Sequence, residues 1–469
     1  MNRNTVSLCL IARDEEATIG MAIKSILALV DEVIVADTGS SDNTRIIAEG
    51  YGAKVIDVPW EDDFSAARNA ALDQATCDWI LVLDADEFLQ PVRPVEFQRL
   101  LQDPRAAGYR LRMISPRSED VGPNINRIRL FRNVPQVRYR YPIHERISPA
   151  LNDWAAAHRL KIMDSGLTLM HEGNGTERGL RKRERNLRIL RGAVEAYPEE
   201  PYFPYRLACA GLTLLDEEVL PVAGLGVSLG LMHTAWFKAR NLPLVDQRNL
   251  PWLPELGIRM AGSLLTLDRI PEARKLLAKV REVFPDHPAV LLQSVAADCR
   301  LLEAPPAAEP QLDRQRVSAG AYADLDRIMS GVTVVPGAAV DRRILDLYPL
   351  RYLGELALQE GRVTAAVDRF EKALSLDPAY SFGWLGMAEC SRYAGDRKRA
   401  LKLYLRTVTE NELNYRAWLR GCDLMSEMEF HDNASSWWVM VADRFPEHPA
   451  VAGVAGPSPA AVEPVLTPA

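Results

Sequence analysis

The stretch Ile80-Leu81-Val82-Leu83-Asp84-Ala85-Asp86-Glu87 joins four consecutive apolar residues to three carboxylates within four positions. This pattern predicts a buried strand that runs out into an acidic loop. If the chain stays extended through the loop, Asp84 and Asp86 project to the same side, because side chains alternate along a strand. Two carboxylates on one side suit Mg²⁺ or Mn²⁺, which share oxygen ligands between protein and substrate phosphates. A solvated turn after a strand is the alternative interpretation.

The chain has 469 residues, of which 48% are hydrophobic and 25% are charged, and its formal net charge is -7. This length predicts two or three domains of ordinary globular composition. The negative charge and the lack of a readable motif argue against nucleic acid as a partner. Six cysteines stand singly, which predicts reduced thiols in a cytoplasmic protein. We expect neither a signal peptide nor a transmembrane segment.

The first ninety residues alternate between short apolar runs and segments of helical periodicity. Strands are predicted at 6–12, 33–36, 54–58 and 79–83, and helices at 16–29, 44–50 and 64–74. Such alternation predicts a parallel sheet with helices on both faces. Ligands of these sheets bind outside the carboxyl ends of the strands. We therefore expect Arg13-Asp14-Glu15, Asp37 and residues 84–87 to converge on one edge.

Beyond Glu87 the pattern is less regular up to about residue 180. Segments 109–113 and 127–131 alternate at period two and predict strands with one solvent-facing, basic side. Segments 142–147 and 167–173 are further strand-like pieces that end in polar residues. From about residue 182 the chain is predicted to be helical.

The C-terminal part repeats every thirty-four residues. Ala366, Ala400 and Ala434 show this spacing, and so do Phe370, Tyr404 and Trp438. Thirty-four is the period of the tetratricopeptide repeat, and residues 353–378 resemble its pattern. An earlier unit places Ala261, Ala273 and Pro285 at corresponding positions. Such repeats stack helix pairs into a curved solenoid whose concave face binds a peptide or another protein.

Four motifs in the first ninety residues resemble, in this order, family 2 glycosyltransferases of the GT-A fold. They are SLCLIARDEE at 7–16, VADTGSSDNT at 35–44, DFSAARN at 63–69 and LDADE at 83–87. The whole chain is similar to bacterial glycosyltransferases that carry tetratricopeptide repeats after the catalytic domain. The resemblance implies an α/β, Rossmann-like GT-A domain for nucleotide-sugar binding, followed by an all-α tetratricopeptide-type solenoid.

The expected division of the chain follows from these patterns. We expect a GT-A glycosyltransferase domain, a helical tetratricopeptide-like region, a linker or long loop, tetratricopeptide repeats and a disordered tail. Their predicted ranges are 1–180, 181–302, 303–340, 341–450 and 451–469.

The resemblance also implies roles for single residues in nucleotide-sugar binding. Asp37 matches the aspartate that contacts the uracil or ribose, and Arg68 matches the arginine that touches the nucleotide. Of the Asp-x-Asp pair, Asp84 is expected at the ribose and Asp86 at the metal on the diphosphate. Arg13 and Glu15 fit the same site, although Asp14 stands where the family often has Asn. The alternatives are a helix cap for Asp37 and a surface arginine for Arg68.

An inverting enzyme, which the family implies, needs a base for the acceptor proton. The candidates are His144-Glu145 and His171-Glu172, which follow short apolar runs. We favour Glu145, with His144 beside it, as the catalytic element, and His171 as a third metal ligand or diphosphate contact. Each of these side chains could instead be a hydrogen-bonded surface group at a strand end.

The sequence therefore predicts a cytoplasmic, Mn²⁺- or Mg²⁺-dependent, inverting glycosyltransferase that uses a nucleotide sugar, expected to be UDP-linked. A peptide or protein held by the repeats is the expected acceptor, and a cell-envelope saccharide is the main alternative. A non-catalytic scaffold with a vestigial glycosyltransferase domain is the hypothesis from another class. The donor sugar, the linkage and the oligomeric state are not identified by the sequence.

Overall fold

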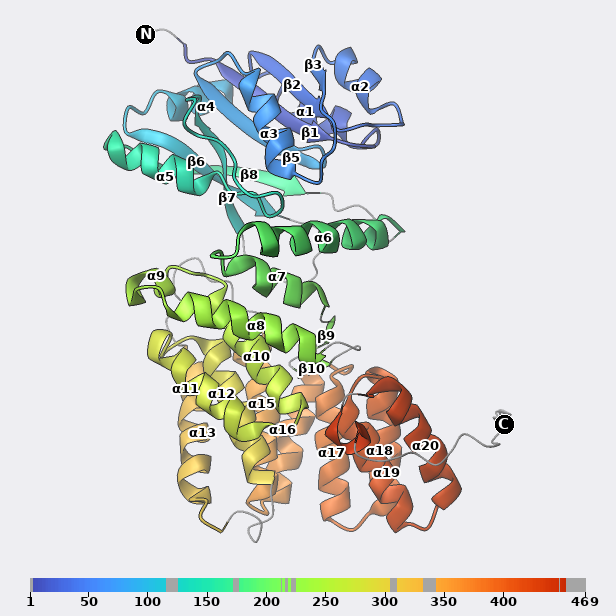
Figure 1. Ribbon diagram of the computed structural model, residues 1–469. Helices are drawn as coiled ribbons and strands as arrows, with labels where there is room; N and C mark the ends of the chain where they lie inside the picture. Colours follow the sequence, from blue (N-terminus) through green and yellow to red (C-terminus); the bar gives the residue numbers. More distant parts are fainter. Residues whose placement is uncertain are drawn as a thin grey trace. The chain divides into compact units, whose positions relative to one another are not determined.

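The computed structural model describes residues 3–114, 125–171, 177–211, 213–215, 218–220, 225–303, 310–331, 343–446 and 448–452. The chain divides into two compact units, residues 1–203 and 204–469. The first is a mixed α/β unit and the second is built almost wholly of helices (Figure 1). The predicted fold class is thus confirmed. Helix α6 (Glu177–Ala196) lies in the first unit and contacts it through the Arg188–Asp62 ion pair.

The first unit is organised around one eight-stranded sheet with the order β3-β2-β1-β4-β7-β6-β8-β5. The strands are β1 (Val6–Ala12), β2 (Glu32–Asp37), β3 (Lys54–Asp57), β4 (Trp79–Asp84), β5 (Glu87–Leu89), β6 (Ala106–Ile114), β7 (Ile125–Arg132) and β8 (Lys161–His171). The first four strands pair in parallel, as predicted. Beyond them the sheet is mixed, because strand-helix alternation ends at β4 and β7 runs antiparallel to both β4 and β6.

Helices cover both faces of this sheet, because alternate residues of each buried strand face opposite sides. Leu8, Leu81 and Leu83 pack in the core that includes α1 (Ile19–Ile26), whereas Cys9 and Val82 pack in the core that includes α3 (Phe64–Asp73). The remaining helices of this unit are α2 (Thr44–Gly50), α4 (Pro94–Leu101) and α5 (Ser148–Ala157).

Two predicted local structures differ from those observed. Segment 142–147 is a loop closed by a bridge between Arg140 and Arg146, not a strand. Left-handed backbone at Tyr141 (φ 81°) and His144 (φ 54°) prevents an extended conformation there. After β4, Ala85 and Asp86 form a turn and Glu87 re-enters the sheet as the first residue of β5. The acidic stretch is therefore a tight corner and not an extended loop.

The second unit contains consecutive helix pairs. Helices α16, α18 and α20 begin at Val363, Arg397 and His431, which are thirty-four residues apart and match the predicted period. The helices of the C-terminal region are α7 (Tyr202–Gly211), α8 (Leu225–Arg240), α9 (Leu244–Arg248), α10 (Leu253–Thr266), α11 (Ile270–Val283), α12 (Pro288–Glu303), α13 (Arg314–Met329), α14 (Arg343–Asp346), α15 (Tyr348–Gln359), α16 (Val363–Leu376), α17 (Ser381–Tyr393), α18 (Arg397–Glu410), α19 (Tyr415–Glu427), α20 (His431–Arg444) and α21 (Pro449–Ala452). A short strand pair, β9 (Thr213–Leu215) and β10 (Glu218–Leu220), lies between α7 and α8.

The packing of the second unit shows which repeat positions are buried and corrects the predicted linker. Phe370 and Tyr404 are fully buried, but in the last repeat Trp437 takes this position and Trp438 is only half-buried. A Cβ on Gly386 would lie 2.2 Å from the Phe370 ring, so only glycine fits there. The predicted linker at 303–340 contains helix α13, whose buried Ala321, Leu325 and Ile328 form an apolar face.

None of the described helices combines the length and the apolar character that crossing a membrane requires.

Candidate functional site

Three strands of the parallel half end at the same edge of the sheet. Ala12 of β1 lies opposite Asp37 of β2, and Ile11 lies opposite Asp84 of β4. The strand register thus brings the ends of three motifs that are far apart in the sequence to one edge.

At this edge two buried arginines share the carboxylate of Asp84. Arg68 of α3 donates from Nη2 to Asp84 Oδ1 at 2.6 Å, and Arg129 of β7 donates from Nη2 to Asp84 Oδ2 at 2.9 Å. Burial alone would raise the pKa of Asp84, but the charges of Arg129 and Arg68 hold it well below its ordinary value. Arg68 is only 5% exposed, so the alternative of a surface arginine is wrong.

Glu87 forms the inner end of this cluster. Its side chain is fully buried, pairs with Arg129, and accepts a hydrogen bond from the Asp84 backbone N–H at 3.1 Å. Burial raises the pKa of Glu87 to about 7, against the opposing charge of Arg129. The third carboxylate of the acidic stretch thus helps to fix Asp84 and does not face solvent.

Glu145 joins the cluster from the loop at 140–146. Its Oε1 accepts a hydrogen bond from Arg68 Nε at 2.8 Å, and its side chain remains 17% exposed. The neighbouring His144 packs edge-on against Tyr202, with ring centroids 5.6 Å apart. In this loop Glu145 thus contacts Arg68, and His144 contacts the Tyr202 ring.

The motif at 63–69 anchors this loop to α3. Asp63 caps the helix by accepting from the Ala66 N–H, and Asn69 exchanges two hydrogen bonds with the Tyr139 backbone, at 3.0 and 2.8 Å. The Phe64 N–H donates to the Pro142 carbonyl at 2.9 Å. These contacts explain why Arg68 and Glu145, seventy-seven positions apart, meet.

Asp86 and His171 form a second, more exposed pair. Glu87 of β5 lies opposite His171 of β8, and this register places His171 Nε2 3.3 Å from Asp86 Oδ2. The hydrogen bond with Asp86 raises the pKa of His171. Within the described ranges, no group of three or more His, Cys, Asp or Glu side chains could hold a metal ion. Asp86 and His171 could hold a divalent cation that takes its other ligands from substrate and water. Glu172 lies outside the described residues.

The loops after β1 and β2 are joined to each other. Asp14, with φ 54°, accepts from the N–H and hydroxyl of Ser41 at 2.7 and 3.0 Å. The Glu15 N–H donates to Thr44 Oγ1 at 2.7 Å, and Glu15 Oε2 accepts from the Thr18 hydroxyl. Asp14 and Glu15 therefore hold the two loops together at the edge of the sheet.

Asp37 is buried at the end of β2. It accepts from the Ser40 N–H at 3.1 Å and from the Ser40 hydroxyl at 2.5 Å, and Arg45 lies 3.6 Å away. These bonds close a loop turn after β2 and are not a helix cap, because α2 begins at Thr44 and has Asn43 at its N-cap position. Arg13 is exposed at the same edge. Burial of Arg185 in α6 lowers the pKa of that arginine, and the positive charge of Arg13 lowers it further.

Sequence reasoning missed Arg129 as a member of the cluster. The alternating pattern at 127–131 predicts that Arg129 faces solvent with Arg127, yet Arg129 is buried. The available signal was the need of Asp84 and Glu87 for counter-charges, because buried carboxylates require partners.

Two nitrogens of the cluster point to a ligand. Arg68 Nη1 and Arg129 Nε are buried and have no hydrogen-bond partner among the described residues. Leaving such a group unpaired costs roughly 1–3 kcal/mol. An oxygen of a bound molecule or of water would satisfy the Arg68 nitrogen.

The sequence is similar to known proteins. Residues 7–150 match the family described as Glycosyl transferase family 2. A TPR repeat-containing protein of Synechococcus elongatus is 35% identical over 57% of this chain and 65% of its own length. An uncharacterized glycosyltransferase of Rickettsia bellii is 36% identical over 26% of this chain and 42% of its own length. The chain thus spans less than two thirds of either relative.

A solved structure of glucosyl-3-phosphoglycerate synthase from Mycobacterium tuberculosis, in complex with Mn²⁺, UDP and phosphoglyceric acid, matches with a TM-score of 0.30 and 20% identity. The match covers 40% of this chain and 76% of that chain, a similarity too low to assign ligands. Residues 7–150, which match the model of glycosyl transferase family 2, thus contain the strand-edge residues described above, and helix pairs with a thirty-four-residue period follow them.

Proposed function

We propose that this chain is a metal-dependent, inverting glycosyltransferase that moves a sugar from a nucleotide sugar, expected to be UDP-linked, to an acceptor. The observation that carries the proposal is the convergence of Asp37, Arg68, Asp84 and Asp86 on one sheet edge within a family 2 domain. The Rickettsia relative, named a glycosyltransferase, supports the same class of activity. The cytoplasm is the proposed location.

Asp86 and His171 are the proposed protein ligands of Mn²⁺ or Mg²⁺. The ion, when bound, would stabilise the negative charge that develops on the departing nucleoside diphosphate. Arg68 would add a fixed positive charge, and its unpartnered Nη1 is available to a diphosphate oxygen. Since Arg129 also pairs with Asp84, the Asp84 carboxylate keeps a counter-charge if Arg68 turns toward the donor.

Asp37, Asp84, Arg13 and Glu15 are the proposed contacts of the nucleotide and sugar. Glu145 is the proposed base, since it is partly exposed and stands next to Arg68. It would take the proton of the acceptor hydroxyl while that oxygen bonds to the anomeric carbon. The bond between this carbon and the phosphate oxygen breaks, and its electron pair leaves with the nucleoside diphosphate. His144 would position Glu145 through the left-handed turn of the loop.

A peptide or protein is the proposed acceptor, because stacked helical repeats form extended concave binding surfaces. A cell-envelope saccharide remains the alternative acceptor. In either case the acceptor hydroxyl must reach the strand edge that holds Glu145.

Donor hydrolysis or transfer by the purified chain with Mn²⁺, measured across a panel of nucleotide sugars, tests the proposal. Asp86→Ala should abolish turnover, because it removes the one carboxylate assigned to the metal. Asp164→Ala is the matched control: this carboxylate lies on β8 with a 70% exposed side chain and should be dispensable. Unchanged turnover in Asp86→Ala would refute the metal assignment.

Thermal shift with nucleotide sugars, with and without Mn²⁺, separates an enzyme from a scaffold with a vestigial domain. A ligand that binds only the folded state raises the unfolding temperature by mass action. No response to any nucleotide sugar would favour the scaffold.

A further inference from the structure

The loop at 140–146, which carries Glu145, has a backbone that is unfavourable by itself. Tyr141 and His144 are both left-handed, with φ 81° and 54°. Residues that carry a side chain rarely adopt this conformation, because the Cβ atom crowds the backbone. They keep it only where surrounding contacts hold them in place. The conformation of this loop therefore depends on packing from other parts of the chain.

Segment 197–203, which follows α6 and ends the first unit, packs against one of the two left-handed residues. The Tyr141 ring lies edge-on against the rings of Tyr197 and Phe203, with 5.2 Å between the centroids of each pair. The Tyr141 hydroxyl donates to Glu200 Oε2 at 2.9 Å. Two aromatic rings and one carboxylate of this segment thus fix the Tyr141 side chain.

Tyr202 of the same segment contacts both neighbours of Glu145. The His144 ring packs edge-on against the Tyr202 ring, with 5.6 Å between their centroids. Arg146 Cζ lies over the same ring, 4.3 Å from its centroid. A cation in this position is attracted by the negative face of the ring. One side chain therefore holds the residues on either side of Glu145.

The position of Glu145 depends on two parts of the chain that are far apart in the sequence. Arg68 of α3 holds its carboxylate directly, at 2.8 Å, whereas segment 197–203 holds the loop from which it projects. A general base has to lie within hydrogen-bond reach of the proton that it removes. Residues 197–203 lie beyond residues 7–150, so this support comes from outside the part of the chain that matches the family.

We propose that Tyr202 is a positioning residue for Glu145. By holding His144 and Arg146, its ring fixes the backbone that aims the Glu145 carboxylate. The inference rests on the proposed function, in which Glu145 takes the proton of the attacking hydroxyl. Tyr202 acts through the loop and not on that proton. Both contacts involve the ring of Tyr202, so phenylalanine should serve in its place.

Steady-state hydrolysis of a nucleotide sugar by the full chain tests this proposal, with water in place of the acceptor hydroxyl. Tyr202→Ala should lower kcat between about tenfold and a hundredfold, because a displacement of about 1 Å near the reacting atoms can cost that much. The KM for the donor should stay unchanged, since the proposed donor contacts remain. Tyr202→Phe should restore kcat. Unchanged kcat in Tyr202→Ala, or an equal loss in Tyr202→Phe, would overturn the proposal.

A double-variant comparison separates positioning of Glu145 from general damage to the site. If Tyr202 acts through Glu145, Tyr202→Ala combined with Glu145→Gln should be no slower than Glu145→Gln alone, because the base is already lost. A further loss of the same factor in the double variant would refute the assignment. Tyr393→Ala is the control, since this tyrosine of α17 is 61% exposed and should be dispensable.

Hydrogen exchange of the loop amides gives a readout that does not require turnover. The Arg146 N–H donates to the Arg140 carbonyl at 3.0 Å, and the Arg140 N–H donates to the Arg146 carbonyl at 3.1 Å. Tyr202→Ala should raise the exchange rate of peptides that cover 140–147, because the bridge opens more often. Tyr202→Phe should leave this rate unchanged. Unaltered exchange in Tyr202→Ala would contradict the proposal.

A second substitution covers the case in which Tyr202→Ala unfolds the first unit. Tyr202→Leu keeps an apolar side chain but has no ring face for Arg146, and it should raise exchange of the loop alone. Unaltered loop exchange and unaltered kcat in Tyr202→Leu would then refute the proposal.

The outcomes for this inference and for the proposed function are distinguishable. Hydrolysis by the original chain, with unchanged kcat and loop exchange in Tyr202→Ala, would refute the positioning role alone. If the original chain hydrolyses no nucleotide sugar but loop exchange rises in Tyr202→Ala, the proposed function is refuted and the contact of Tyr202 with the loop is supported.

Discussion

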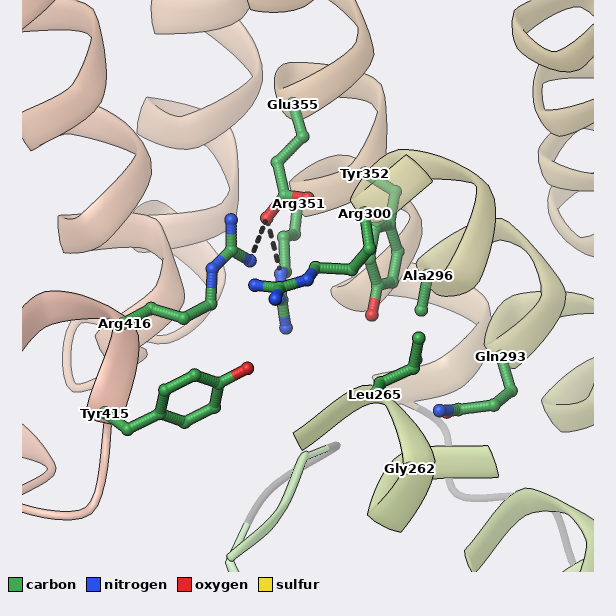
Figure 2. Close-up of a pocket in the computed structure, with 10 residues that line it drawn as sticks. All are labelled: Gly262, Leu265, Gln293, Ala296, Arg300, Arg351, Tyr352, Glu355, Tyr415 and Arg416. Atoms are coloured by element: carbon green, nitrogen blue, oxygen red, sulfur yellow. Dashed lines mark hydrogen bonds and ion pairs between the residues drawn. The ribbon is translucent and has the colours of Figure 1, made fainter. Parts of the chain in front are cut away.

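The two units each contain a cluster of arginines and carboxylates, but the two clusters differ in charge balance. At the sheet edge, three carboxylates (Asp84, Glu87 and Glu145) surround two arginines. In the helical unit, three arginines (Arg300, Arg351 and Arg416) contact three carboxylates (Asp268, Glu303 and Glu355). Figure 2 shows Arg351 and Arg416 bonded to the same carboxylate, that of Glu355. The excess of carboxylates suits the first cluster to a ligand that brings a cation, whereas the pairs of the second cluster join neighbouring helices.

The largest effect is expected from Arg68→Gln, which tests whether the first cluster depends on its shared cation. The substitution leaves Asp84 and Glu145 without their common partner, and breaking such a buried pair costs about 3–5 kcal/mol of unfolding free energy. Urea denaturation measures this loss, and titration with UDP should show no detectable binding.

Arg188→Gln is the matched control for that experiment. Arg188 pairs with Asp62 at 2.7 Å, but its side chain is 64% exposed. Pairs between exposed side chains contribute little, so stability and UDP affinity should both stay near those of the original chain. An equal loss in both variants would remove the distinction between buried and surface arginines.

Arg129 gives a smaller and more selective effect. Arg129→Lys keeps one charge near Asp84 and Glu87 but not the fork of donors, so UDP affinity should fall while the fold persists. Arg129→Met should lower stability as well, because Glu87 and Asp84 lose a buried counter-charge. If Arg129→Lys binds UDP as tightly as the original chain, Arg129 serves the fold and not the site.

The smallest effects concern pH and have opposite signs in the two units. Asp86 raises the pKa of His171. The Asp86–His171 pair should therefore stabilise the metal-free chain at pH values below the pKa that His171 has in the unfolded state. This stabilisation should be lost as the pH rises through the pKa that His171 has in the folded state. Burial lowers the pKa of His287 in the helical unit. The stability that the neutral His287 side chain contributes should therefore be present at pH values above its pKa in the unfolded state. It should be lost as the pH falls through its pKa in the folded state.

The unfolding free energies of His171→Gln and His287→Gln, measured by denaturation in EDTA, are compared with that of the original chain. The measurements cover pH 5 to 8, which brackets the ordinary histidine pKa of about 6.5. The difference for His171→Gln should shrink as pH rises, and that for His287→Gln should shrink as pH falls. Parallel pH dependence of the two variants would contradict the opposite shifts.

Local patterns predicted most of the first ninety residues correctly. The strands β1, β2 and β4 and helices α2 and α3 lie within a residue or two of their predicted positions, because each has a clear periodicity and a recognisable turn. Segment 142–147 was predicted as a strand, since apolar and polar residues alternate there. Its left-handed residues and its attachment to α3 are tertiary features that alternation does not reveal.

The sequence by itself determined the two-part architecture, the thirty-four-residue repeat and the set of polar residues at the strand ends. These features depend on short-range periodicity and on the rule that parallel strands end at one edge. Only the tertiary structure decided the partners of those residues. It placed Arg129 and Glu87 with Asp84, brought Glu145 to Arg68, and formed a pocket from four helices of the second unit (Figure 2). Charges buried together must find partners in space, and pairing across tens of residues leaves no local pattern.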